Sequence, residues 1–278
     1  MREKGLIANA LSISCVENYF LGWCAECNIS KEVLFSKSYL SASEILNDFL
    51  TSGAKFEHYD KIPRVMRVAE VCCATKHIAV KELDFALIDK EICSGNLVLV
   101  EVGVRFFEHI AIRPWRNDHF IWLTGKIKGG YKYLNNYPLN EGVLSTSQIK
   151  ENYNGKTLIY YAQEKLNTSI IEQNSAEQLR QMKNFQSEIL KMPEKIDPFA
   201  LRNAVGIIKI TRLRIAKWLA TIRRYEEACL VERYSAELSN IYIVLEAAIL
   251  RKQFEATRAL EKINKILEKE NTLLQMIK

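Results

Sequence analysis

Glycine and proline are distributed unevenly along the 278 residues of the chain. Ten of the eleven glycines lie at or before Gly155, and neither residue type occurs in 207–278. Because glycine and proline form turns and interrupt helices, the carboxyl-terminal third can form long helices, whereas the earlier part must turn often. The sequence therefore predicts a change of architecture near residue 165.

The segment before this change contains short β-rich runs. The runs are LVLVEV, HFIWL, YKYL and TLIYYA at 97–102, 119–123, 131–134 and 157–162. Turn signals such as Gly129-Gly130 and the NNYP segment at 135–138 separate neighbouring runs. Apolar and aromatic runs divided by such turns are typical of antiparallel strands, so we expect one antiparallel sheet.

Helical patterns precede and follow this sheet. Residues 9–52 have helical periodicity, with Ser43 as the expected cap of a short helix. After a helix at 175–192 and a break at Pro193, Asp197-Pro198 predicts the start of a long helix. Two further helices are expected at 230–250 and 254–277. The last has an apolar seam that Glu270 interrupts, which we interpret as a packed bundle helix. The fold class is therefore α+β, with domains 1–165 and 166–278.

Composition narrows the class of protein. A hydrophobic share of 48% excludes a disordered chain, and 39 basic against 33 acidic residues give a net charge of +6 that does not require a nucleic-acid partner. The sequence has no phosphate-binding loop, dinucleotide fingerprint or HExxH helix, so we expect no bound metal, ATP or NAD. Seven irregularly spaced cysteines favour a reducing compartment, and no apolar run reaches the roughly 18 residues of a membrane span. We expect a cytoplasmic protein without membrane contact.

Three residues, in this order along the chain, predict a Cys-His-Asn triad: Cys15, His119 and Asn135. Cys15 would begin a helix, where the N–H groups and the positive end of the dipole lower a thiol pKa. His119 would open a strand as general base, and Asn135, at the end of the next strand, would orient its imidazole. Asn136 is the alternative triad member. Asn9, six positions before Cys15, could join the Cys15 N–H in an oxyanion hole.

These residues resemble the papain-like cysteine enzymes, and more closely the family of the butirosin biosynthesis acyltransferase. SISCVENYFLGWCAECNISKEVLF at 12–35 is similar to the nucleophile segment of that family. Residues 119–149 are similar to its histidine strand, hairpin, triad-closing strand and Ser-rich segment, and residues 201–270, with Arg212, Trp218 and Tyr234, to the helical domain that follows. Members of the family carry Asp before Pro, where this chain has Asn135-Asn136-Tyr137-Pro138. The resemblance implies a papain-like domain followed by a helical bundle.

The resemblance also implies a reaction. Cys15 would accept an acyl group from the phosphopantetheine thioester of an acyl or peptidyl carrier protein and pass it to a small-molecule amine, in specialised metabolism such as antibiotic biosynthesis. No cofactor bound to the chain itself is implied. Two alternatives stay open: a hydrolase (peptidase, amidase or thioesterase) with the same triad, and a non-catalytic papain-like scaffold. The carboxyl-terminal helices could cover the acceptor cleft, bind the carrier protein or form a homodimer interface.

Overall fold

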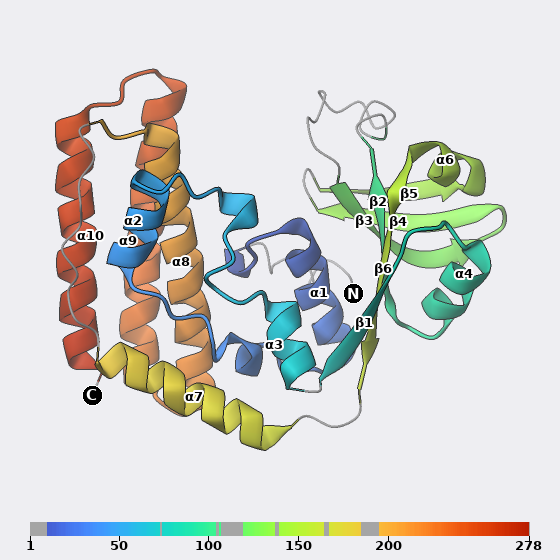
Figure 1. Ribbon diagram of the computed structural model, residues 1–278, viewed down its shortest axis with the longest axis horizontal. Helices are drawn as coiled ribbons and strands as arrows, with labels where there is room; N and C mark the ends of the chain where they lie inside the picture. The colour runs from blue at the N-terminus through green and yellow to red at the C-terminus, as the bar shows by residue number, and fades with distance from the viewer. Residues whose placement is uncertain are drawn as a thin grey trace. The chain divides into compact units, whose positions relative to one another are not determined.

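The computed structural model describes residues 10–72, 74–103, 106, 119–136, 139–163, 167–184 and 195–277. The fold is α+β, with amino-terminal helices, an antiparallel sheet of six strands, and carboxyl-terminal helices that pack together (Figure 1). Contacts divide the chain into two compact units. We call residues 1–29 and 69–167 the sheet unit, and residues 30–68 and 168–278 the helical unit. Residues 30–68 thus pack with the carboxyl-terminal helices, although they fall within the range expected for the first domain.

The sheet has the strand order β1-β6-β2-β3-β4-β5, and every neighbouring pair is antiparallel. Its strands are β1 (Thr75–Val80), β2 (Leu97–Val102), β3 (His119–Ile127), β4 (Gly130–Asn136), β5 (Leu139–Ser145) and β6 (Tyr153–Ala162). All four predicted runs form strands, namely β2, β3, β4 and β6. The predicted Gly129-Gly130 turn joins β3 to β4, and a Cβ on Gly130 would overlap the Leu144 carbonyl oxygen of β5. Glycine is therefore required at position 130, where β4 and β5 approach each other.

Helices cover both faces of this sheet. Helix α4 (Phe85–Cys93) places Ile88 in a buried cluster with Val98 and Val100 of β2. Helix α1 (Cys15–Glu26) packs its aromatic residues on the opposite face, where Tyr19 lies edge-on to Trp122 and Phe20 to Tyr160. Because side chains alternate between faces, a strand between two helical layers must be apolar throughout, which explains the continuous LVLV run of β2. A short helix, α6 (Thr146–Asn152), links β5 to β6.

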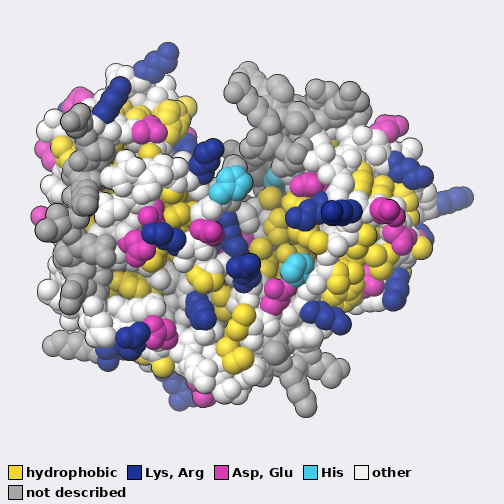
Figure 2. All heavy atoms as spheres, viewed as in Figure 1, with side chains coloured by type: hydrophobic (Ala, Val, Ile, Leu, Met, Phe, Trp, Pro, Cys, Tyr) yellow, Lys and Arg dark blue, Asp and Glu magenta, His cyan; other side chains and the backbone are white. Residues whose placement is uncertain are grey.

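The helical unit is built on α8 (Pro198–Thr221), which packs against α9 (Tyr225–Leu250) and against α2 (Ala42–Leu50) (Figure 1). Helix α10 (Ala256–Met276) packs on α9, on α2 and on α7 (Thr168–Lys183). The remaining short helices are η3 (Lys31–Phe35), η4 (Phe56–His58) and α3 (Val65–Val71). On the face shown in Figure 2, basic and acidic side chains of the described residues are interspersed.

The ends of two helices test the capping predictions. Asp197 caps α8 by accepting a hydrogen bond from the Phe199 N–H at 3.0 Å, and Pro198 is the first helical residue, as predicted. The prediction for α2 was wrong by two residues, because Ser41 rather than Ser43 is its N-cap. Ser41 Oγ accepts from the Glu44 N–H at 3.1 Å, while Ser43 lies in the first turn and its hydroxyl contacts Ser41. The N-cap is therefore the serine three residues before Glu44. The predicted break at Pro193 lies outside the described residues.

Candidate active site

Cys15 is the first residue of α1, and polar contacts fix the turn that leads into it. The N-cap Ser14 accepts a hydrogen bond from the Glu17 N–H at 3.2 Å. The Glu17 carboxylate is fully buried and accepts the Ile13 N–H at 2.6 Å. These two bonds hold the chain on either side of Cys15. Cys15, which is partly buried, is therefore at the amino-terminal end of a capped helix. At this end the backbone N–H groups and the helix dipole favour a negative charge.

His119 and Asn136 meet at the ends of two neighbouring strands. His119 opens β3, has 6% of its surface exposed, and places Nε2 3.2 Å from Oδ1 of Asn136, the last residue of β4. With the amide oxygen as acceptor, Nε2 carries the hydrogen and the lone pair of the neutral ring is on Nδ1. This arrangement fixes the tautomer of an imidazole that could accept a proton at Nδ1.

Both asparagines at the end of β4 act on His119. Asn135 is fully buried, and its side chain acts on the pKa of the imidazole in the same direction as that of Asn136. Burial lowers the pKa of His119 below its ordinary value, although the two asparagine side chains act in the opposite direction. The imidazole is therefore neutral at neutral pH, as a general base must be before the reaction. Of the two asparagines, Asn136 is the one whose amide oxygen lies within hydrogen-bond distance of the imidazole.

Tyr19 joins the cysteine helix to the strands that carry His119 and Asn136. Its hydroxyl donates to the Phe120 carbonyl at 3.0 Å and accepts the Asn136 N–H at 2.9 Å. Tyr19 is one helical turn after Cys15, so both side chains lie on the same face of α1. Burial raises the pKa of Tyr19 well above its ordinary value, and the charge of Cys15 acts in the same direction.

The structure thus brings four of the predicted residues into one compact unit. Cys15, His119, Asn135 and Asn136 belong to the sheet unit, and α1 packs against both β3 and β4. The predicted oxyanion residue, Asn9, lies outside the described residues. Sequence reasoning missed Tyr19, because an aromatic residue in an apolar helix looks like ordinary core. The only sequence signal was its spacing of four residues from Cys15.

The described residues contain no group of three or more His, Cys, Asp or Glu side chains that could hold a metal ion. Cys24 is buried in the last turn of α1, and Cys27 follows the end of this helix, where its backbone N–H donates to the Trp23 carbonyl. Likewise, none of the helices in the described ranges is both long and apolar enough to cross a membrane.

A separate cavity of about 610 Å³ lies within the helical unit. The segment after η3 supplies Ser36 and Tyr39 to its lining, and α7 supplies Asn174 and Gln178. Gln178 also fixes the wall, because its Oε1 accepts the Ser38 and Tyr39 N–H groups at 2.6 and 2.9 Å. The lining consists of helical-unit residues alone and does not include the Cys15 site.

Comparison with models of known protein families finds no match for this chain, and comparison with curated proteins finds no relative.

Proposed function

We propose that the chain is a papain-like cysteine acyltransferase that moves an acyl group from a carrier-protein thioester to a small-molecule amine. The observation that carries this proposal is the buried pair of His119 and Asn136, at strand ends against which the Cys15 helix packs. A neutral, oriented imidazole beside a helix that begins with cysteine is the arrangement used for thiol nucleophiles. The order of the residues along the chain and the family resemblance add to it.

The proposed reaction has two half-steps. Cys15 Sγ attacks the thioester carbonyl while His119 Nδ1 takes the thiol proton, and the proton then passes to the departing phosphopantetheine thiol. In the second half, the amine attacks the acyl-Cys15 carbonyl, gives its proton to His119, and releases Cys15, which regains the proton. Asn136, with Asn135, holds the imidazole through both halves. The Cys15 backbone N–H and Asn9 would stabilise the oxyanion.

The partners follow from this chemistry: a carrier protein as donor, an amine as acceptor, and no cofactor bound to the chain itself. A cytoplasmic setting in specialised metabolism suits such a donor. The net charge of +6 is compatible with an acidic carrier protein. The carboxyl-terminal helices keep three candidate roles, which are covering the acceptor, binding the carrier protein and forming a homodimer.

The test is intact-protein mass spectrometry. Wild type and Cys15→Ala are mixed with a panel of acyl-pantetheine thioesters, and amine acceptors are then added. We expect a mass increase equal to the acyl group on wild type only, and its loss on addition of an amine with formation of the amide. Discharge to water alone would identify a hydrolase. An adduct that persists in Cys15→Ala would rule out Cys15 as the nucleophile.

A further inference from the structure

We infer that Tyr19 is a positioning residue for the cysteine site: its hydroxyl sets the position of Cys15 relative to His119 and Asn136 by bridging the two strands that carry them. This inference rests on the proposed function. It assigns a role to a residue outside the proposed Cys-His-Asn triad.

The register of β3 and β4 explains why the bridge forms at this point. Trp122 of β3 pairs with Leu134 of β4. Because the strands are antiparallel, the residue two positions before Trp122, which is Phe120, faces the residue two positions after Leu134, which is Asn136. The Phe120 carbonyl and the Asn136 N–H bond the Tyr19 hydroxyl, at 3.0 and 2.9 Å. The hydroxyl is therefore inserted between the ends of two strands and joins them to each other and to α1.

Each residue that takes part in the Tyr19 bridge is close in the sequence to a residue of the proposed site, or is itself one. Phe120 follows His119, Asn136 supplies both the bridging N–H and the amide oxygen that holds Nε2, and Tyr19 is one turn from Cys15. A shift of the hydroxyl would move all three groups. Because a displacement of about 1 Å can cost on the order of a hundredfold in rate, this bridge controls whether the thiol and the imidazole can exchange a proton.

The surroundings of Tyr19 suit a fixed role. The side chain is 1% exposed, and its ring lies edge-on to Trp122 with centroids 6.4 Å apart. Its hydroxyl has one donor and one acceptor partner, which uses its hydrogen and one lone pair. A buried, neutral hydroxyl held on both sides can neither rotate freely nor take part in proton transfer at ordinary pH.

The test compares Tyr19→Phe with Tyr131→Phe. Tyr131 is 2% exposed, lies on β4 like Asn136, and donates its hydroxyl to Asp89 at 2.6 Å, but its ring belongs to the cluster on the α4 face. Both variants lose one buried hydroxyl, so both lose stability. The readout is the rate of iodoacetamide alkylation of Cys15 against pH, measured by peptide mass spectrometry. The exposed Cys93 and Cys229 serve as references in the same sample.

We expect Tyr19→Phe to slow Cys15 alkylation at neutral pH by about tenfold or more, with Cys93 and Cys229 unchanged. Its pH profile should lose the dependence on His119 and coincide with that of His119→Ala. The Asn136 backbone N–H should also lose protection from hydrogen exchange, because its acceptor, the Tyr19 hydroxyl, is gone. Tyr131→Phe should keep the wild-type Cys15 rate and profile.

Two results would overturn the inference in distinguishable ways. A Tyr19→Phe protein with the wild-type Cys15 rate and pH profile would refute the positioning role and leave the proposed function intact. A wild-type Cys15 that reacts no faster than Cys93, and is indifferent to His119→Ala, would refute both. If Tyr19→Phe does not fold, para-aminophenylalanine can replace Tyr19, because its amino group still donates to the Phe120 carbonyl but is a poor acceptor for the Asn136 N–H. The alkylation rate of Cys15 should then fall to a value between those of wild type and His119→Ala. An unchanged rate would contradict the positioning role.

Discussion

The imidazole of His119 hydrogen-bonds the neutral amide of Asn136, whereas many catalytic triads use a carboxylate in this position. A carboxylate stabilises the imidazolium and raises the pKa of the histidine, but an amide oxygen does so only weakly. Burial is therefore the larger effect, and the pKa of His119 is lowered. In the proposed mechanism, this keeps His119 in the form that accepts a proton, at the expense of stabilising the imidazolium after the transfer.

The lowered pKa of His119 makes stability depend on pH. A histidine in the unfolded chain binds its proton near pH 6.5, whereas His119 in the folded chain binds it only at lower pH. The unfolded state thus takes up more protons below pH 6.5, and the free energy of unfolding should fall as the pH drops from 7.5 to 5.5. Urea unfolding at these two pH values should show a larger loss in wild type than in His119→Gln. Equal losses in both proteins would show that His119 titrates normally in the fold.

Residue-scale prediction succeeded where one side chain carries the signal, and failed where backbone atoms do. Local patterns predicted that Cys15 begins a helix and His119 begins a strand, and both do. They predicted Asn135 at the end of the next strand, with Asn136 as the alternative, and the last residue of β4 is Asn136. The role of Tyr19 depends on the Phe120 carbonyl and the Asn136 N–H, which any residue type would present. No residue pattern marks such partners, so only the folded geometry could show them.

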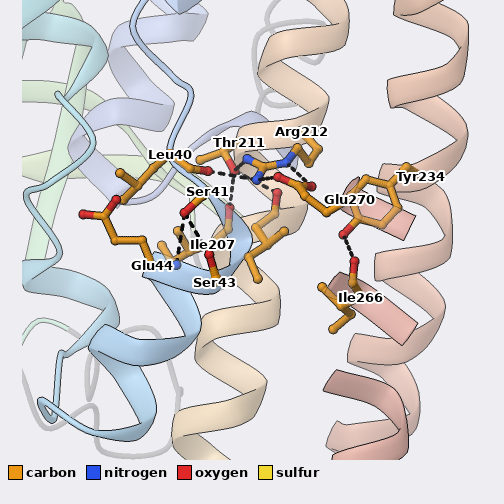
Figure 3. A network of polar contacts seen from close by, with 11 residues as sticks. Leu40, Ser41, Ser43, Glu44, Ile207, Thr211, Arg212, Tyr234, Ile266 and Glu270 are labelled. Atoms are coloured by element: carbon orange, nitrogen blue, oxygen red, sulfur yellow. Dashed lines mark hydrogen bonds and ion pairs between the residues drawn. The ribbon is translucent and has the colours of Figure 1, made fainter. Parts of the chain in front are cut away.

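At the scale of elements, Glu270 explains the break in the apolar seam of α10. It is 1% exposed and pairs with Arg212 of α8, which is 2% exposed; Glu270 Oε2 accepts from Arg212 Nε at 3.0 Å (Figure 3). Arg212 also donates to the Leu40 carbonyl at 2.8 Å, and Tyr234 of α9 donates to the Ile266 carbonyl of α10 at 2.9 Å. The interruption is therefore the buried half of an ion pair that links α8, α10 and the segment before α2.

Removing one partner of this pair should be costly. Arg212→Met leaves the Glu270 carboxylate buried without its counter-charge, and we expect about 3–5 kcal/mol less free energy of unfolding. Adding Glu270→Leu removes that charge, so the double variant should recover much of the lost free energy of unfolding. It should remain about 1–3 kcal/mol below wild type, because the Leu40 carbonyl has lost its donor. The control is Lys217→Met, which breaks the exposed Lys217–Glu232 pair between α8 and α9 and should change stability by less than about 1 kcal/mol. Denaturant unfolding measures all four proteins. A double variant no more stable than Arg212→Met would contradict this account.

Strands were predicted where burial makes the sequence uniformly apolar, and missed at the two edges of the sheet. Four of the six residues of β1 are exposed, and β5 carries Leu139 and Val143 on its exposed positions. An edge strand needs apolar side chains on one face at most, so its pattern resembles a loop. The long helices α9 and α10 were easier to predict, because residues 207–278 contain no glycine or proline to end them.

On the scale of the whole molecule, the two compact units are interleaved in the sequence. The helical unit takes residues 30–68 from the amino-terminal half and 168–278 from the end of the chain. Helix α2 and η3 both pack against α8, which lies about 150 residues later in the chain. Segments that lie far apart in the chain therefore pack together in the helical unit, and a cut near residue 167 divides this unit.

A chain that ends at residue 167 should therefore aggregate. It would keep η3 and α2 but lose α8, so that their fully buried side chains would meet water: Leu34, Phe35, Ile45, Leu46 and Phe49. Exposed apolar surface of this extent favours association, and we expect the fragment to be insoluble or to bind a hydrophobic dye strongly. Co-expression with residues 168–278 should restore a soluble complex, because both parts of the helical unit are again present. The measurement is size-exclusion chromatography of the fragment alone and with its complement. A monomeric, cooperatively unfolding fragment 1–167 would show instead that residues 30–68 do not need the carboxyl-terminal helices.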